Sequence, residues 1–546
     1  MRILTALLLT IAALPCAVRA APQATEPSAA ERLGAVAFPV SCSPHERAQF
    51  SRGVALLHDF WYGEARRQFE QIAAAGPGCA MAHWGIAMSV FHPIWDRPDA
   101  QTMARGWSEM QAASSPGPKT AREREYVAAL KGFFRPDRRG YQPRIEGYAA
   151  AMAKLHRHHP RDIDASAFYA LALLAAQAPD DTTLAQNRRA MAVLAPLFTR
   201  FPDHPGIVHY IIHACDTPLL APDGLRAAQH YGEIAATAPH AVHMPGHIFA
   251  RLGMWQADIA SNLASVAASK AAEARHQSGA MDQLHSDDFL LYAFLQTGRD
   301  AEAAGILRDA AAVLDRFESM GDMGEHYMDG MFPYYRTKLP IFSALEMRDW
   351  KAAAALEPVA GARPETQVMT YWARTVAAGH LRDPVAARAG LAAYDALMQQ
   401  VRDGRDAYVA DSTGARIGRG EMLGWSAFAD GNPEAALKLL RDSADLQDQV
   451  GQGEVDIPAR EMLADMLLDS GRPQEALIEY RQALELSPNR FNGLYHAGMA
   501  AEAAGETAQA RGYYTALLEA TDGGAHSARP EFEHLKAFTS RTARAD

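Results

Sequence analysis

The chain has 546 residues, with 53 lysines and arginines against 64 aspartates and glutamates, so its formal net charge is −11 at pH 7. An acidic chain is a poor match for nucleic acid or an anionic membrane surface, and we expect neither as a partner. A single compact core is unfavourable at this length, whereas an array of stacked repeats has no such limit.

The amino-terminal stretch MRILTALLLTIAALPCAVRAAPQA has the features of a secretory signal. A basic residue precedes a short apolar run, and small residues surround a cleavage site after Ala20. No later segment has the roughly 20 consecutive apolar residues of a transmembrane helix. We therefore expect a signal peptide at 1–20, no integral membrane segment, and a mature protein that is periplasmic or secreted.

Three cysteines follow this cleavage site: Cys42, Cys79 and Cys215. In an oxidising compartment the simplest disulfide joins Cys42 to Cys79, which would pin the amino-terminal segment to the first helical hairpin. Cys215 is then the odd cysteine, and a buried thiol is its simplest interpretation.

Apolar residues recur at helical spacing along the chain and alternating β-branched runs are nearly absent, so we expect an all-α protein. The segment REMLADMLLDSGRPQEALIEYRQALELSPN follows the 34-residue tetratricopeptide (TPR) pattern of small, turn, aromatic and proline positions. The matching residues are Ala464, Gly471, Ala476, Tyr480, Ala483 and Pro488, then Gly498, Gly505, Ala510 and Tyr514 one period later, and Gly53, Ala65, Phe69 and Pro77 near the amino terminus. The expected fold is a TPR-like α-solenoid of stacked antiparallel helix pairs, in one or two lobes.

The repeat pattern divides the chain into six expected segments. They are a signal peptide at 1–20, a linker at 21–41, a TPR-like array with a histidine-rich groove at 42–318, degenerate helical pairs at 319–410, TPRs at 411–520, and a polar tail at 521–546.

Two His-x-x-x-His pairs are the most informative feature of the sequence. His209 and His213 lie in IVHYIIHACD, and His243 and His247 follow 34 residues later in VHMPGHIF. The i, i+4 spacing places both rings of a pair on one helix face, about 5–6 Å apart at Cβ. Neighbouring helices lie roughly 8–10 Å apart, so the four imidazoles can converge on one metal ion. A polar network, or an anion held by imidazolium, is the alternative.

Pro245 complicates the second pair, because proline interrupts a helix unless it lies in the first turn. Other ligand-capable side chains occupy repeat positions that point into the groove. They are His240, His285, Asp288 and Tyr292, with Asp216 beside the first pair and His58 and His92 in the first two repeats.

The chemistry that these residues support is that of an imidazole-rich metal site. Neither HYIIH nor HMPGH has the glutamate of HExxH, so the zinc-peptidase mechanism lacks its general base. Imidazole ligands suit copper or zinc. A closed four-histidine site would be structural or a carrier, whereas an open position would permit a metal-bound water or an oxidative reaction. We find no phosphate-cradling glycine loop and expect no nucleotide cofactor.

Four segments resemble those of a group of bacterial, signal-bearing TPR-like proteins of similar length, over about 42–296. The segments are HPGIVHYIIHACDTP, APHAVHMPGHIFARLGMW, LLHDFWYGEARRQF and CAMAHWGIAMSVFHPIW. The resemblance implies an exported array of TPR-like helices, in which the histidine-bearing segments are part of the sequence pattern shared by the group. It implies no particular activity. Cys215 is more usually aromatic in that pattern and Gly246 a serine, so Cys215 is not an expected ligand.

The sequence favours an exported TPR-type solenoid whose concave face binds a metal ion, copper or zinc, or a small polar ligand. One alternative is an interaction scaffold that binds a peptide or an envelope protein in its groove. Another is a metal-dependent oxidase or hydrolase. Polar residues spread over many repeats would indicate the scaffold, and a cluster within two or three repeats beside a pocket would indicate a metal site.

Overall fold

The computed structural model describes residues 31–115, 117–320, 328–404, 406–453 and 455–542. The predicted signal peptide lies outside these ranges, so its cleavage and the export of the protein remain predictions. All of the structure presented below belongs to the compact unit Arg32–Asp546. Among the described helices, none combines the length and the hydropathy needed to cross a membrane.

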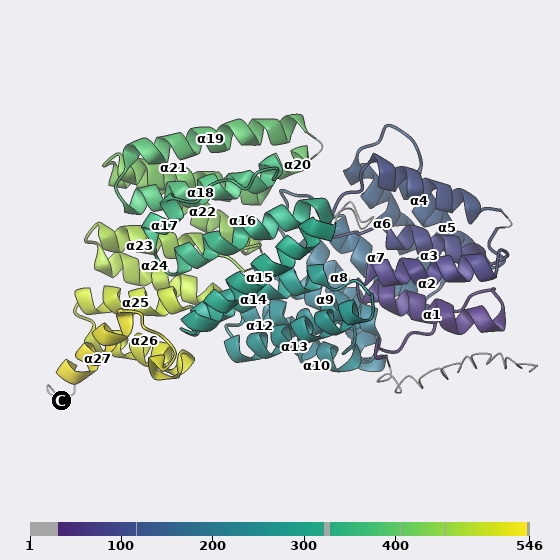
Figure 1. The fold of residues 1–546 in the computed structure, drawn as a ribbon, viewed down its shortest axis with the longest axis horizontal. Coiled ribbons are helices and arrows are strands. Elements are labelled where there is room, and N and C mark those ends of the chain that lie inside the picture. Colours follow the sequence, from purple (N-terminus) through teal and green to yellow (C-terminus); the bar gives the residue numbers. More distant parts are fainter. Residues whose placement is uncertain (1–30, 116, 321–327, 405, 454, 543–546) are drawn as a thin grey trace, which may run out of the picture. The chain divides into compact units, whose positions relative to one another are not determined.

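The described part of the chain consists of helices and loops, without a strand (Figure 1). The first third contains α1 (Pro44–His58), α2 (Tyr62–Ala75), α3 (Ala80–Ser89), α4 (Ala100–Ala112), α5 (Ala121–Phe134), α6 (Tyr141–His158), α7 (Ile163–Ala175) and α8 (Ala185–Arg200). The middle contains α9 (Pro205–Cys215), α10 (Ala221–Ile234), α11 (Pro239–His243), α12 (Pro245–Arg251), α13 (Trp255–Ala274), α14 (Ala280–Gln296), α15 (Asp300–Met320), α16 (Met328–Glu346) and α17 (Trp350–Ala354). The last third contains α18 (Pro364–His380), α19 (Pro384–Asp403), α20 (Ala407–Ala410), α21 (Thr413–Ala429), α22 (Pro433–Val450), α23 (Ala459–Asp469), α24 (Pro473–Leu486), α25 (Phe491–Ala503), α26 (Thr507–Ala520), a 3₁₀ turn at Asp522–Gly524 and α27 (Glu531–Thr542).

Successive helices pack as pairs because small residues on one helix receive aromatic rings from the next. A Cβ atom at Gly53 would lie 2.7 Å from the Phe69 ring, and one at Gly498 would lie 2.1 Å from the Tyr514 ring. These are the small and aromatic positions of the predicted repeats, and the helices that carry them are in contact. The predicted fold class, an all-α TPR-like solenoid, is confirmed.

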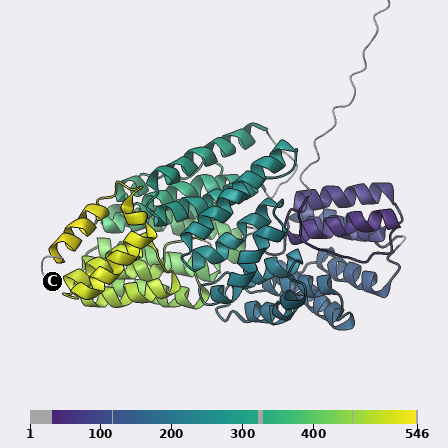
Figure 2. The same ribbon diagram turned by 90° about the horizontal axis from the view of Figure 1, so that it is seen from below.

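The carboxy-terminal repeats contact the central helices as well as one another. Gly253 has φ of 62°, and a Cβ atom there would lie 2.3 Å from the Pro488 carbonyl oxygen, so this turn requires glycine. The Trp255 indole donates to the Asn489 carbonyl at 2.7 Å. Helix α25, which begins at Phe491, lies side by side with α26 in the yellow part of Figure 2 and also contacts α14.

The carboxy-terminal segment differs from the polar tail expected at 521–546. It contains α27, whose Phe532, Leu535 and Phe538 are buried in the core of the last repeats. Their spacing of three residues places the three side chains on one helix face, which covers the apolar side of the preceding pair.

The amino-terminal segment also departs from a simple linker at 21–41, since Phe38 and Val40 are buried in the first core. The cysteines that follow, Cys42 and Cys79, are joined by a disulfide. The bond links the residue before the N-cap of α1 to the N-cap residue of α3, so it fastens this segment onto the first repeats.

We expect replacement of both Cys42 and Cys79 by alanine to lower the free energy of unfolding by about 2–4 kcal/mol, because the bond closes a loop across 37 residues. Guanidinium unfolding followed by tryptophan fluorescence measures the change. Reductant should weaken the wild type and leave the double variant unaffected. Equal stability of both proteins without reductant would contradict the prediction.

Candidate metal centre

Helix α9 and the short helix α11 bring three histidines together. The Nε2 atoms of His209 and His213 are 3.0 Å apart, and the ring centroids of His209 and His240 are 5.1 Å apart. One ring nitrogen from each residue lies within 4.8 Å of the other two. We call these three residues the first histidine group.

A second group of three comes from α11, α12 and α14. The Nε2 atoms of His243 and His247 are 2.9 Å apart, and the centroids of His243 and His285 are 4.2 Å apart. The complication expected at Pro245 takes the form of a break between two helices: α11 ends at His243 and α12 begins at Pro245, which has no N–H to continue the helix. The short helices nevertheless hold the two rings together in an edge-to-face arrangement, with their planes at 81° and their centroids 4.9 Å apart.

The two groups adjoin and form one six-histidine cluster. Ring centroids are 6.3 Å apart for His213 and His247, and 5.9 Å apart for His240 and His243. The four histidines predicted as ligands therefore lie together, and two histidines predicted only to line the groove, His240 and His285, complete the two sets of three. The structure arranges the rings as three and three, not as four around one point.

Hydrogen bonds to Nδ1 orient the rings. His209 donates from Nδ1 to the His58 carbonyl oxygen at 2.5 Å, and His243 donates from Nδ1 to Asn262 Oδ1 at 2.6 Å. The Asn262 amide in turn donates to Asp258 Oδ1 at 2.6 Å. A ring that donates from Nδ1 carries its lone pair on Nε2, and in both cases Nε2 faces a neighbouring ring.

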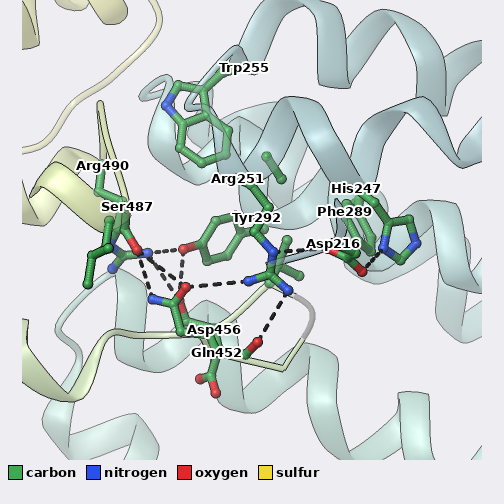
Figure 3. Close-up of a pocket in the computed structure, with 13 residues that line it drawn as sticks. Asp216, His247, Arg251, Trp255, Phe289, Tyr292, Gln452, Asp456, Ser487 and Arg490 are labelled. Carbon is green, nitrogen blue, oxygen red and sulfur yellow. Dashed lines mark hydrogen bonds and ion pairs between the residues drawn. The ribbon is translucent and has the colours of Figure 1, made fainter. Parts of the chain in front are cut away.

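Asp216 orients the third ring in the same way. His247 donates from Nδ1 to Asp216 Oδ2 at 2.8 Å, and Arg251 donates to Asp216 Oδ1 at 3.0 Å, as Figure 3 shows. Burial alone would raise the pKa of Asp216, but Arg251 and His247 outweigh it and hold this pKa well below its usual range. Asp216 is therefore a carboxylate whose two oxygens are both bound.

Burial favours the neutral form of three histidines of the cluster. Desolvation, together with the neighbouring imidazoles, holds the pKa of His209, His240 and His285 well below 6.5. His240 is 2% exposed, and in the described part of the chain neither of its ring nitrogens has a hydrogen-bond partner. Neutral imidazole is the form that binds a metal ion.

A pocket of about 240 Å³ opens onto both histidine groups. Its lining consists of Ile94, Trp95, Leu174, Gln177, Asn187, His213, Asp216, His240, His247 and His285. The cluster is therefore accessible from one side, which a closed structural site would not be.

His58 belongs to a separate buried network. Its Nδ1 is 2.9 Å from the Tyr210 hydroxyl, and its Nε2 is 3.0 Å from Asp164 Oδ1, which also lies 3.3 Å from His204 Nε2. Burial lowers the pKa of His58 to about 4. The side chain supports the packing of α1 on α7 and α9, and its backbone oxygen orients His209.

Three other predicted groove residues lie outside the cluster. The His92 ring is hydrogen-bonded to a backbone carbonyl in its own turn. Asp288 forms a buried ion pair with Lys338. Tyr292 donates to a backbone carbonyl at 2.8 Å and also contacts Arg490, in the small cavity beside His247 (Figure 3).

The sequence analysis missed Asn262 and Asp258, which hold His243 in place from α13. Both side chains are fully buried, and burial raises the pKa of Asp258 well above its ordinary value. A Cβ atom at Gly246 would lie 2.7 Å from both side chains, so this glycine permits their approach. Both residues lie on the buried face of α13 with Trp255 and Ile259, spaced i, i+4, and two polar residues on an apolar helix face are a signal that could have identified them.

A larger pocket, of about 680 Å³, shares Gln177 with the histidine pocket. Apolar and aromatic residues form much of its wall, among them Phe342, Val368, Trp372, Tyr394, Met398 and Ile417. Glu421 lies at this wall and accepts a hydrogen bond from the Trp372 indole at 2.7 Å. Burial, with a smaller contribution from Asp456, raises the pKa of Glu421 to about 8.

These features define a TPR-like α-solenoid with a histidine-rich centre, and the comparisons with known proteins agree on the repeats. Residues 421–490 and 461–525 match the tetratricopeptide-repeat family model, which confirms the predicted carboxy-terminal TPRs. No curated protein matches the chain. Among solved structures, the human IFIT1 dimer with m7Gppp-AAAA is 10% identical with a TM-score of 0.37, over 81% of this chain and 90% of that one. A monomeric IFIT1 mutant with Gppp-AAAA has the same identity and coverage and a TM-score of 0.32.

We expected no nucleic-acid partner because the chain is acidic, and that inference from net charge is wrong. Both IFIT1 structures contain capped oligonucleotides. The charge of −11 belongs to the whole chain and does not determine the potential inside one groove. At 10% identity and these TM-scores, the likeness assigns no ligand to this chain.

Proposed function

We propose that this protein is an exported TPR-like solenoid that binds copper or zinc in its six-histidine cluster. The observation that carries the proposal is the pairing of Nε2 atoms at 3.0 Å in one group and 2.9 Å in the other. Two nitrogens that each lie about 2.0–2.1 Å from one ion are about 2.9–3.4 Å apart. In the second group, where both rings donate from Nδ1, a cation between them stabilises lone pairs that would otherwise face each other.

The oxygen atoms that accept hydrogen bonds from histidine Nδ1 atoms support the same proposal. His58 carbonyl, Asn262 and Asp216 each accept from one histidine of the cluster. Acceptors of this kind usually accompany metal-bound histidines, where they set the ring orientation and raise the basicity of the ligand nitrogen. Ligation by imidazole alone favours zinc or copper over magnesium or calcium.

Export is the second part of the proposal. The bond between Cys42 and Cys79 supports it, because structural disulfides persist in oxidising compartments such as the periplasm. The amino-terminal sequence pattern points the same way.

Metal-dependent catalysis is a second candidate function. The pocket of about 240 Å³ at the cluster favours it, because a catalytic ion keeps a coordination position accessible to water or substrate. A hydrolase would use a metal-bound water, and an oxidase would use a redox-active ion.

Elemental analysis of the full chain, produced without a metal-binding tag, tests the proposal. We expect near-stoichiometric copper or zinc in the wild type, and at least a tenfold lower content in a variant with His213→Gln and His247→Gln, which removes one ligand from each group. The matched control carries His380→Gln and His496→Gln, two histidines outside the cluster with little exposed side-chain surface. Circular dichroism establishes that all three proteins are folded.

Metal content that is equal in the cluster variant and the control would reject the proposal. So would a wild type that retains neither copper nor zinc after reconstitution and dialysis. A cluster variant that lost its helicity would be replaced by the single variant His213→Gln, which changes a partly exposed ring.

A further inference from the structure

We infer that the six-histidine cluster is a two-ion centre, in which each histidine group holds one ion and a small anionic oxygen donor bridges the two from the pocket. This inference rests on the proposed metal site and deepens it. The first group is His209, His213 and His240, and the second is His243, His247 and His285.

The partition into two sites follows from which ring nitrogens lie near one another. Within each group, one nitrogen per ring lies within 4.8 Å of the other two, so one ion can reach all three rings. The groups adjoin, because the ring centroids of His213 and His247 are 6.3 Å apart, the same distance as His213 to His240 within the first group. The cluster therefore has two adjoining points of convergence, and three imidazoles leave at least one position of a tetrahedral ion open.

His240 is the residue that makes the first group a site of three. It is buried, and within the described residues neither ring nitrogen has a hydrogen-bond partner. The nearest carboxylate oxygen, from Asp282, is 3.9 Å from Nδ1. A buried polar group without a partner destabilises the fold, and ligation of an ion removes that cost.

Both groups face the same pocket. His213 and His240 of the first group and His247 and His285 of the second all contribute to its lining. The open positions of two ions held there would point into a shared space, and paired ions about 3.5–4 Å apart typically clamp one oxygen between them.

Charge identifies the bridging ligand as an anion from outside the protein. The six imidazoles are neutral ligands, so two divalent ions would bring four positive charges. Asp216 supplies one negative charge at the cluster, but its two oxygens are held by His247 and Arg251. Asp288 is paired with Lys338, and Asp282, the carboxylate near His240, does not line the pocket. A hydroxide, a carboxylate or a phenolate entering the pocket would meet a strong positive field.

Metal stoichiometry and electron paramagnetic resonance of the full chain test the inference. Apoprotein dialysed against Zn²⁺ or Cu²⁺ is expected to retain two ions per chain. The Cu²⁺ form should show far fewer than two spins per chain, because a bridging oxygen couples the two ions magnetically. His240→Gln and His285→Gln should each retain one ion and show one uncoupled spin, and the control His496→Gln should behave as the wild type.

The outcomes separate this inference from the proposed function. A wild type that binds no ion would overturn both. A wild type that binds a single ion, lost equally in His240→Gln and His285→Gln, would overturn the two-ion centre and leave the metal site standing. Two ions with two uncoupled spins would overturn the bridge. If the variants do not fold, the stoichiometry and spin count of the wild type decide alone.

Discussion

Replacement of Arg490 by methionine is expected to lower the free energy of unfolding by about 3–5 kcal/mol. The guanidinium is 1% exposed and donates to Glu346 at 2.9 Å and to both oxygens of Glu461 at 2.9 and 3.0 Å. It also contacts the Tyr292 hydroxyl in the cavity of Figure 3. Methionine fills similar space but leaves two buried carboxylates without their cation. The cost of keeping these unpaired carboxylates away from water accounts for most of the expected loss of stability.

The network explains why the effect should be large here. Arg490 precedes α25 in the carboxy-terminal repeats, and its partners lie on α16, α23 and α14, so one side chain joins repeats that are distant in sequence. Urea unfolding of the variant measures the change. Arg472→Met is the matched control, because that arginine is one-third exposed and pairs with surface glutamates. We expect a change below about 0.5 kcal/mol there.

Equal losses for Arg490→Met and Arg472→Met would contradict this account. Adding Glu461→Gln to Arg490→Met should recover part of the lost stability, since it removes one of the stranded charges. A double substitution that is as unstable as the sum of the single ones would show that the two side chains are not coupled.

Replacement of Glu421 by glutamine is expected to stabilise the protein at alkaline pH by an amount on the order of 4 kcal/mol. The pKa of Glu421 is raised to about 8 by burial, with a smaller contribution from Asp456. Below the ordinary glutamate pKa, both the folded and the unfolded state hold the proton and stability is unaffected. As pH rises towards 8 the unfolded state releases the proton first, so stability falls by about 1.4 kcal/mol per pH unit.

Glutamine does not titrate, and its side-chain oxygen can still accept from the Trp372 indole that now donates to Glu421 at 2.7 Å. The difference between wild type and variant should therefore be near zero at pH 4 and grow through pH 8, as measured by denaturant unfolding across this range. Glu434→Gln serves as the control, because its side chain is 83% exposed and should give a flat difference. Parallel curves for Glu421→Gln and the wild type would contradict the prediction.

Much of the fold could be predicted from local pattern. The positions assigned to small and aromatic residues, such as Gly53 with Phe69 and Gly498 with Tyr514, are close contacts in the structure. The predicted repeat glycines Gly471 and Gly505 have positive φ. These features recur every 34 residues because each repeat packs an aromatic side chain against a small residue in the same way. One repeat therefore predicts the positions of the next.

Local pattern was misleading where a segment packs against distant residues. The region at 521–546 reads as polar, yet α27 buries Phe538 and Leu535 against the last repeats. The region at 21–41 was expected to be a linker, yet Phe38 and Val40 are buried in the first core. In each case the outcome depends on which surface the neighbouring helix presents.

The sequence by itself determined the 34-residue repeat period, because that period and the helical spacing of apolar residues can be read directly from the order of residues. The period places His209 and His213 one repeat before His243 and His247, and so brings these four histidines near one another. Tertiary structure decided how those histidines are divided. His240 completes one group from α11 and His285 completes the other from α14. Asn262 and Asp216 then orient the rings from two further segments. These contacts join helices that do not occupy equivalent positions in consecutive repeats. The repeat period therefore does not predict them, and only the packing of the helices determines them.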